Sequence, residues 1–211
     1  MDDNVWGVHG GLLERLAGGP ISWEACEVPG DIAADHGVRQ DVHPHVATLV
    51  ETADDPDRIP AGSDVPICLD TAHVTLGGAD ALELADRAAG RVGLVHLEDV
   101  RLAVAARLHA GELALVAAFQ VGLFAPLGDG DVPVADVITT LERHGYDGLY
   151  ALESDMAING GEPPAGEGPV RDVAKSVAYV RSLAPALSAT LRAGAGPGSP
   201  ASTEHQRGTQ P

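Results

Sequence analysis

Short aliphatic runs alternate with stretches of helical spacing along this chain, and this pattern limits the folds open to it. Each short run is a candidate strand, and the runs cover residues 20–23, 37–43, 65–70, 91–97 and 148–153. The stretches with helical spacing cover residues 52–59, 80–88, 134–144 and 169–183. Strands that alternate with helices are typical of a parallel sheet, because each parallel connection must return across the sheet. The sequence therefore predicts an α/β fold.

Residues that can bind a metal ion or transfer a proton stand at the ends of four of these runs. His43 and His45 end the second run, Asp70 ends the third, His96 lies near the end of the fourth and Glu153 ends the fifth. In parallel α/β folds the carboxyl ends of the strands meet at the edge where active sites form. Core packing favours none of these residue types. We therefore expect them to share one site.

The composition excludes several classes of protein. The 211 residues carry a formal net charge of −18 and include one lysine, Lys175. A protein that binds nucleic acid needs a basic face, so we expect no nucleic-acid partner. No apolar run is long enough to span a bilayer, and the N-terminus lacks the features of a signal peptide, so we expect no membrane partner and a cytoplasmic location. Cys26 and Cys68 form no CxxC pair, which fits a reducing compartment.

The length suits one domain, which we expect over residues 1–192. Residues 193–211 contain few large apolar side chains and many Gly, Pro, Ser and Thr residues. We expect this tail to be disordered.

Each strand-end residue also has a structural interpretation. The two histidines of HPH point to one face of an extended chain, where they either chelate an ion or form a solvated pair. Asp70 is either a ligand or the N-cap of a following helix. His96 is either a ligand or a hydrogen-bonded core histidine. Glu153 follows a strand and has no capping preference.

Taken together, a set of two carboxylates and two imidazoles suits a borderline divalent ion such as Mn, Co, Zn or Fe better than Ca. Glu51, six residues after His45, either turns back toward this site or is a helix-start carboxylate.

Several motifs resemble those of the sugar phosphate isomerase/epimerase family of xylose isomerase-like TIM barrels, most of all its myo-inosose dehydratase-like branch. They are PISWEACEVPG, HPHVATLVET, CLDTAHVTLGGAD, RVGLVHLEDV, GLFAPLGDGDV and GYDGLYALESD. The resemblance implies a (β/α)8 barrel with a divalent metal ion at the strand ends. It also implies a sugar or cyclic polyol as substrate, with proton transfer next to a carbonyl.

The resemblance assigns roles to individual residues. Asp70, His96 and Glu153 match the metal ligands of the family, and His45 stands where related epimerases carry a fourth ligand, a glutamate. The residues that match positions near the substrate are His43, Glu51 and His73. Glu153 is the first candidate for the catalytic base and Glu51 the second. Glu98 stands where the family pattern has a lysine.

The chain is too short for the complete barrel that the family implies. PISWEACEVPG matches the first strand, whereas the next motif matches the fifth, so about a hundred residues have no counterpart near position 30/31. We therefore expect an incomplete barrel of about five strands, whose unpaired edges favour self-association. Three functions remain open: a metal-dependent isomerase or epimerase, an inosose dehydratase-like lyase, and a non-catalytic remnant of the fold.

Overall fold

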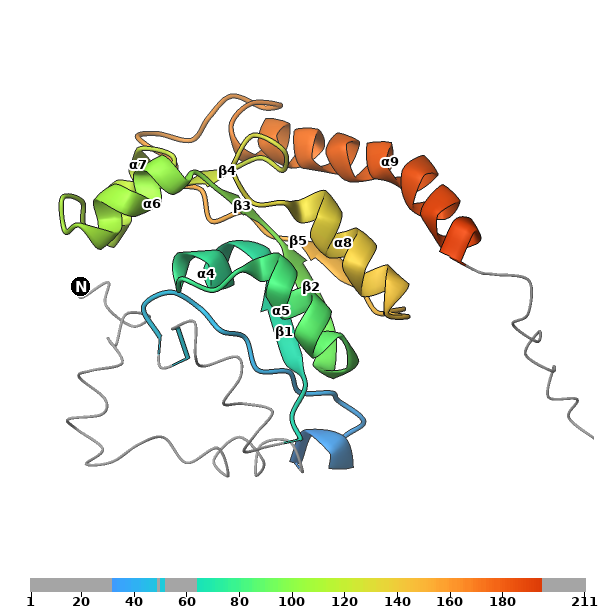
Figure 1. The fold of residues 1–211 in the computed structure, drawn as a ribbon. Helices are drawn as coiled ribbons and strands as arrows, with labels where there is room; N and C mark the ends of the chain where they lie inside the picture. Colours follow the sequence, from blue (N-terminus) through green and yellow to red (C-terminus); the bar gives the residue numbers. More distant parts are fainter. Residues whose placement is uncertain (1–31, 49, 52–63, 195–211) are drawn as a thin grey trace, which may run out of the picture.

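Three parallel strands form the central sheet of the computed structural model, which describes residues 32–48, 50–51 and 64–194. They are β1 (Ile67–Asp70), β2 (Val92–Leu97) and β5 (Tyr150–Leu152), in the order β1-β2-β5 (Figure 1). Val42 forms a single parallel bridge to Ile67 on β1. The α/β fold with parallel strands is confirmed, and the described residues form an open sheet rather than a closed barrel.

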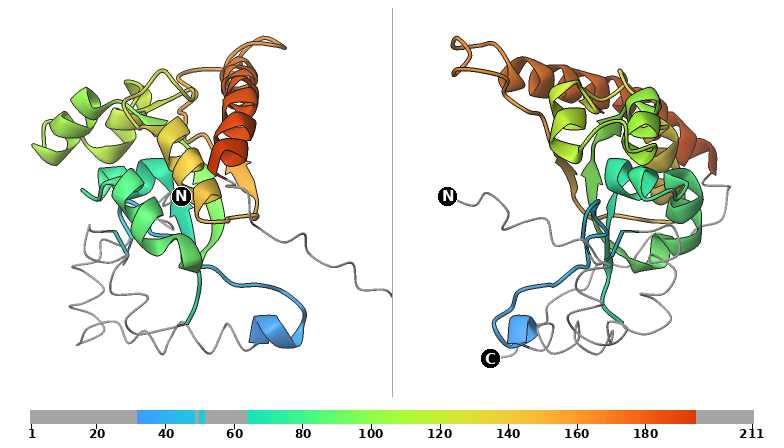
Figure 2. Two further views of the ribbon diagram at one scale, coloured as in Figure 1. Left: turned by 45° about the vertical axis from the view of Figure 1, so that its right-hand side comes forward. Right: turned by 90° about the vertical axis from the view of Figure 1, so that its left-hand side faces the viewer.

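Two amphipathic helices, α5 (Ala81–Ala88) and α8 (Val134–Arg143), pack against each other over one face of this sheet (Figures 1 and 2). Each helix repeats apolar residues at the i, i+3, i+4 and i+7 spacing of a buried stripe. The buried residues of the two stripes are Ala81, Leu84, Ala85, Ala88, Val134, Val137, Ile138 and Leu141. The aliphatic core of the protein therefore lies between this helix pair and the sheet.

The two faces of β2 differ in burial. Side chains alternate across a strand, and Val95 and Leu97 on one face are 0% and 1% exposed. Leu94 and His96 on the opposite face are only partly buried. In a closed barrel that second face would line the interior, so His96 projects into a space that remains open to solvent.

The other elements connect these units. A short antiparallel pair, β3 (Asp99–Val100) and β4 (Phe124–Ala125), lies beyond the end of β2. Further helices are α4 (Thr71–Leu76), the 3-10 turn η1 (Ala89–Arg91), α6 (Leu102–His109), α7 (Leu115–Gln120) and α9 (Pro169–Gly194), and residues 32–35 form one helical turn. The chain therefore returns to the sheet twice, once between β1 and β2 and once between β2 and β5.

A fully buried carboxylate, Asp99, holds the loop after β4. Its Oδ2 accepts hydrogen bonds from the backbone N–H groups of Gly128 and Gly130, at 2.9 and 3.0 Å, and its Oδ1 accepts from Val132 at 3.0 Å. Gly128 has φ of 86°, a left-handed conformation that favours glycine. The GDGDVP segment is therefore a turn held by a side chain of β3.

Most predicted elements in the described residues are confirmed. Strands occur within 65–70, 91–97 and 148–153, and helices occur at 80–88, 134–144 and 169–183. The strand predicted at 37–43 is wrong, because this segment pairs with β1 at Val42 alone. Gly37, with φ of 69°, ends a helical turn where that strand was expected to begin. The strand predicted at 20–23 and the helix predicted at 52–59 lie outside the described residues.

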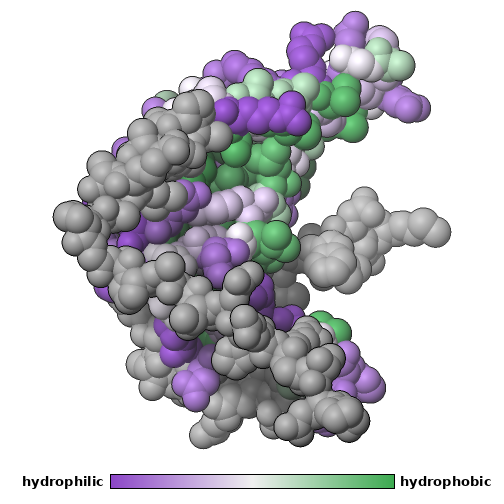
Figure 3. Space-filling view, turned by 90° about the vertical axis from the view of Figure 1, so that its right-hand side faces the viewer, coloured by the Kyte–Doolittle hydropathy of each residue, from purple (hydrophilic) through white to green (hydrophobic). Residues whose placement is uncertain are grey.

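The surface beside β5 is partly apolar. Exposed large hydrophobic side chains include Leu149 and Leu152 around β5 and Val170 and Val173 on α9. Figure 3 shows apolar surface on this side of the molecule. No helix in the described part of the chain is both long enough and apolar enough to cross a membrane. The cytoplasmic location stays a prediction, as does the tail boundary, because α9 runs to Gly194 and the residues beyond lie outside the described part.

Candidate metal centre

The sheet register brings the predicted strand-end residues together. Asp70 is the last residue of β1 and pairs with His96 on β2. Glu153 directly follows β5, and its backbone N–H donates to the carbonyl of Leu97 at 3.2 Å. His43 follows the bridged Val42. Because these strands are parallel, all four side chains start from the same edge of the sheet.

Four of these side chains converge on one point. His43, Asp70, His96 and Glu153 each offer one ligand atom, and these atoms all lie within 4.8 Å of one another. Oδ2 of Asp70 is 3.7 Å from Nε2 of His43 and 3.6 Å from Nδ1 of His96. Nδ1 of His96 also contacts Oε2 of Glu153. Two nitrogens and two carboxylate oxygens therefore face one another.

Asp70 divides its two oxygens between two roles. Oδ1 accepts from the backbone N–H groups of Ala72 and His73, at 2.8 and 2.7 Å, and so caps α4. Oδ2 has no hydrogen-bond partner although the side chain is 0% exposed. A buried carboxylate oxygen without a partner costs free energy unless a cation or a donor satisfies it. The cap and ligand interpretations of Asp70 are therefore compatible.

The donor set fits a divalent ion. Nε2 of His43 is buried and lacks a hydrogen-bond partner, as Oδ2 of Asp70 does. Imidazole nitrogens combined with carboxylate oxygens suit borderline ions such as Zn, Co, Mn and Fe. Buried atoms without hydrogen-bond partners are stronger evidence for a bound ion than the burial of the cluster alone.

The pKa values at this point reflect the contact between His96 and Glu153. Hydrogen bonds with Cys68 and with Glu153 raise the pKa of His96 to about 10. The same contact with His96 lowers the pKa of Glu153 below its ordinary value, against the opposing effect of burial. Glu153 is therefore ionised at neutral pH, as a base must be.

A second group lies beside the first. His45, His73 and Asp155 also have ligand atoms within 4.8 Å of one another. The rings of His45 and His73 are stacked with centroids 3.6 Å apart. Nε2 of His73 lies 3.7 Å from Oδ2 of Asp155 and 3.8 Å from Oε2 of Glu98. The His73 side chain is 0% exposed, and burial lowers its pKa to about 4, so the ring is neutral at neutral pH.

Glu98 is a buried carboxyl group between the two groups. Burial first, and then the charge of Asp70, raise its pKa to about 9, so it keeps its proton at neutral pH. Its Oε1 accepts a hydrogen bond from the backbone N–H of Asp155 at 2.5 Å. In this chain the position where the family has a lysine therefore carries a neutral acid rather than an anion.

The predicted site residues fall into two groups in the structure, and one of them lies in neither group. Asp70, His96 and Glu153 lie together as expected, but His43 joins them, whereas His45 lies with His73. Glu51 belongs to neither group, and its backbone carbonyl lies against Gly77 at the end of α4.

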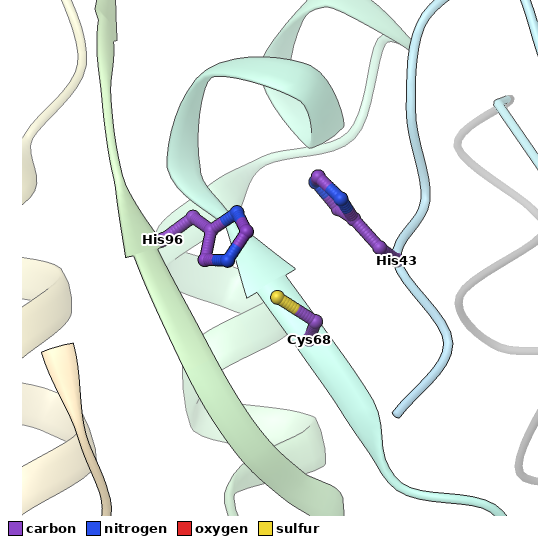
Figure 4. A group of neighbouring side chains, drawn as sticks. All are labelled: His43, Cys68 and His96. Atoms are coloured by element: carbon purple, nitrogen blue, oxygen red, sulfur yellow. The ribbon is translucent and has the colours of Figure 1, made fainter. Parts of the chain in front are cut away.

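Sequence reasoning missed Cys68. This residue forms a third group with His43 and His96 (Figure 4). Its position two residues before Asp70 on a strand was the available signal, because such residues share a face. The roles of all these residues as ligands remain predictions.

Parallel βα units with candidate ligands at the strand ends define an α/β protein of the TIM-barrel class. A sequence model of the family described as xylose isomerase-like TIM barrel matches residues 23–182, and the chain belongs to this family. The resemblance seen in the sequence motifs is confirmed.

Individual relatives show how far the likeness extends. An inosose dehydratase of Geobacillus thermodenitrificans (strain NG80-2) is 30% identical over 155 residues, which are 72% of this chain and 50% of that protein. The chain thus spans about half the length of the curated relatives it matches.

Two solved structures are similar in fold. An L-ribulose 3-epimerase has a TM-score of 0.59 at 17% identity, over 84% of this chain and 58% of that one. The IolI protein with a bound zinc atom has a TM-score of 0.52 at 14% identity, over 77% of this chain and 54% of that one.

Proposed function

We propose that the protein is a metal-dependent isomerase or epimerase that moves a proton next to a carbonyl group of a sugar or cyclic polyol. One observation carries this proposal. Four donor atoms from separate segments converge, and all four, including Oδ2 of the wholly buried Asp70, are buried without a hydrogen-bond partner. Relatives that include an inosose dehydratase, and a fold shared with a sugar epimerase, support the substrate class.

His43, Asp70, His96 and Glu153 would hold the ion. When bound, a divalent ion supplies Lewis-acid polarisation of a carbonyl or hydroxyl oxygen of the substrate. The zinc atom in the IolI structure supports this assignment of a metal. The sequence placed His45 in the fourth position, whereas the distances favour His43, and His45 stacks on His73 beside the centre.

Glu153 is the base of the proposed reaction. Its carboxylate is ionised at neutral pH because the contact with His96 lowers its pKa. It would remove the proton from the carbon next to the carbonyl group, and delivery of a proton to the other face by a second acid would epimerise that carbon. Return to the neighbouring carbon isomerises the sugar. Glu51, the second candidate from sequence, lies outside the convergent groups.

Two neutral groups lie buried beside the four donor atoms. The His73 ring is uncharged at neutral pH, so it adds no positive charge beside the centre. Glu98 is a protonated acid, which can donate one hydrogen bond. Neutral groups beside the centre suit an uncharged polyol better than a phosphate group, which would need cations.

Dehydration is the second candidate reaction. It is favoured by the inosose dehydratase that is 30% identical over 155 residues. The first step is the same removal of a proton by Glu153, after which a β-hydroxyl group leaves in place of proton return. A non-catalytic role is the third, because the described sheet has three strands where a barrel has eight.

Deuterium exchange tests the proposal and separates these outcomes. The metal-loaded protein is incubated with ketoses and with inososes in deuterated water, and NMR locates the deuterium. We expect deuterium on the carbon next to the carbonyl group, with an epimer or ketose–aldose pair as product; an enone-type product would indicate the dehydratase.

Glu153→Gln should slow this exchange by about a hundredfold or more, the usual contribution of a general base. Glu112→Gln is the matched control, because the Glu112 side chain is 62% exposed and pairs with Arg107 away from the centre. A protein that binds the ion and exchanges no proton of any ketose or inosose would establish the non-catalytic role instead.

A further inference from the structure

We propose that the thiolate of Cys68 is also a ligand of the ion at the strand ends, so that the centre takes a thiophilic divalent ion such as Zn²⁺ rather than Mn²⁺ or Mg²⁺. The inference rests on the metal centre of the proposed function. Cys68 is a free cysteine in β1 and is 2% exposed. Figure 4 shows its sulfur pointing toward the space between the rings of His96 and His43.

The geometry joins Cys68 to the same two imidazoles that face Asp70. Sγ of Cys68 and one ring nitrogen each of His43 and His96 lie within 4.8 Å of one another. Cys68 thus approaches the pair of histidines from within the sheet.

Asp70 provides an independent indication that a ligand belongs there. Cys68 and Asp70 are two residues apart on β1, so their side chains share one face of the sheet. Asp70 is 0% exposed, and its unpartnered Oδ2 lies 3.7 Å from His43 and 3.6 Å from His96. Cys68 and Asp70 therefore approach the same two imidazoles from neighbouring positions on one face of β1, as members of two groups that share His43 and His96.

A sulfur ligand changes which ion the site prefers. When the ion binds, the S–H bond of Cys68 breaks, the sulfur bonds to the metal and the proton passes to solvent, with no change in oxidation state. Thiolate and imidazole together favour Zn²⁺ and Co²⁺, whereas Mg²⁺ and Mn²⁺ prefer oxygen ligands. A site of imidazoles and carboxylates alone would accept Mn²⁺ more readily.

Packing is the competing role of Cys68, since a buried cysteine often acts as a small apolar side chain. Cobalt spectroscopy separates the two roles, because only a Co²⁺–thiolate bond gives an intense near-ultraviolet charge-transfer band. We expect the band in the wild-type chain and in Cys26→Ser, which removes the other cysteine, and its loss in Cys68→Ser. We also expect Cys68→Ser to lower Zn²⁺ affinity about tenfold or more, with a smaller loss for Mn²⁺.

X-ray absorption of the zinc-loaded protein keeps the inference testable if Cys68→Ser does not fold. Cys26→Ser should show one sulfur at about 2.3 Å from zinc, the usual Zn–S distance. A protein that binds Co²⁺ and Zn²⁺ with no charge-transfer band and no sulfur neighbour would overturn the role of Cys68 and leave the proposed centre intact. A protein that binds neither ion would overturn the proposed centre as well.

Discussion

Asp70 offers the sharpest separation of metal binding from folding, because its two oxygens do different things. Oδ1 accepts two backbone N–H groups at 2.8 and 2.7 Å, whereas Oδ2 is unpartnered in the interior. Asn caps helices about as well as Asp, so Asp70→Asn should keep the cap while removing the charge that an ion needs. Asp70→Ala removes both the cap and the ligand.

The expected magnitudes follow from these contacts. Without metal, Asp70→Ala should lower the free energy of unfolding by about 1–2 kcal/mol through loss of the cap, and Asp70→Asn should leave it no lower than in the wild type. With Zn²⁺ at a hundred times its dissociation constant, the wild type should gain about 2.7 kcal/mol, and neither variant should gain as much.

Urea unfolding in the presence of chelator measures the contribution of the cap, and unfolding in excess Zn²⁺ measures the gain from zinc. Asp80→Ala is the matched control, since Asp80 caps α5 through Leu82 and Glu83 at 2.8 and 3.0 Å. It should lose the cap contribution and keep the full gain from zinc. If Asp70→Asn keeps the wild-type gain from zinc, Oδ2 of Asp70 is not a ligand.

Three other predictions concern the loop, the pH dependence and the open sheet. Asp99→Ala should destabilise the protein by about 2–4 kcal/mol in urea unfolding, because it breaks three hydrogen bonds to a buried carboxylate, and a loss below about 1 kcal/mol would contradict this role. Metal affinity should rise with pH up to about 10, because His96 must lose its proton before it can bind an ion; calorimetry in buffers of different ionisation enthalpy should detect the released proton, and a pH-independent affinity would exclude His96 as a ligand. The chain should self-associate through the β5 edge, so light scattering after size exclusion should show more than a monomer, and Leu152→Lys should reduce association; a cooperatively melting monomer would tell against this.

Much of the fold was predictable because its strands are buried on both faces or alternate strictly. All four residues of β1 are buried, and such aliphatic runs stand out in a sequence. The helices α5 and α8 carry regular apolar stripes and were found for that reason. The helices α4 and α7 were missed, since six residues hold too little periodicity. The helix α6 is as long as α5 but buries Ala105 alone, so it carries no apolar stripe. The strands β3 and β4 have two residues each and show no periodic pattern of apolar residues.

The candidate site was predictable at strand ends and less so between them. Asp70, His96 and Glu153 follow from the parallel register alone. His43 and His45 were expected on one face because they are two residues apart, but the chain turns at 46–47, and Ala47 has φ of 61°. The rings of His43 and His45 meet at 83°; His43 lies against His96, with ring centroids 4.8 Å apart, whereas His45 stacks on His73. Local backbone geometry of this kind has no signature in residue spacing.

The metal content of matched histidine variants tests the proposed centre most directly. Protein purified without chelator is analysed by mass spectrometry for bound Zn, Co, Mn and Fe. The centre described by His43, Asp70, His96 and Glu153 predicts close to one divalent ion per chain in the wild type and in His45→Ala, and none in His43→Ala or in the double variant Asp70→Ala/Glu153→Ala. Retention of the ion by the double variant would contradict the centre, and loss of the ion in His45→Ala but not in His43→Ala would move its fourth ligand to His45.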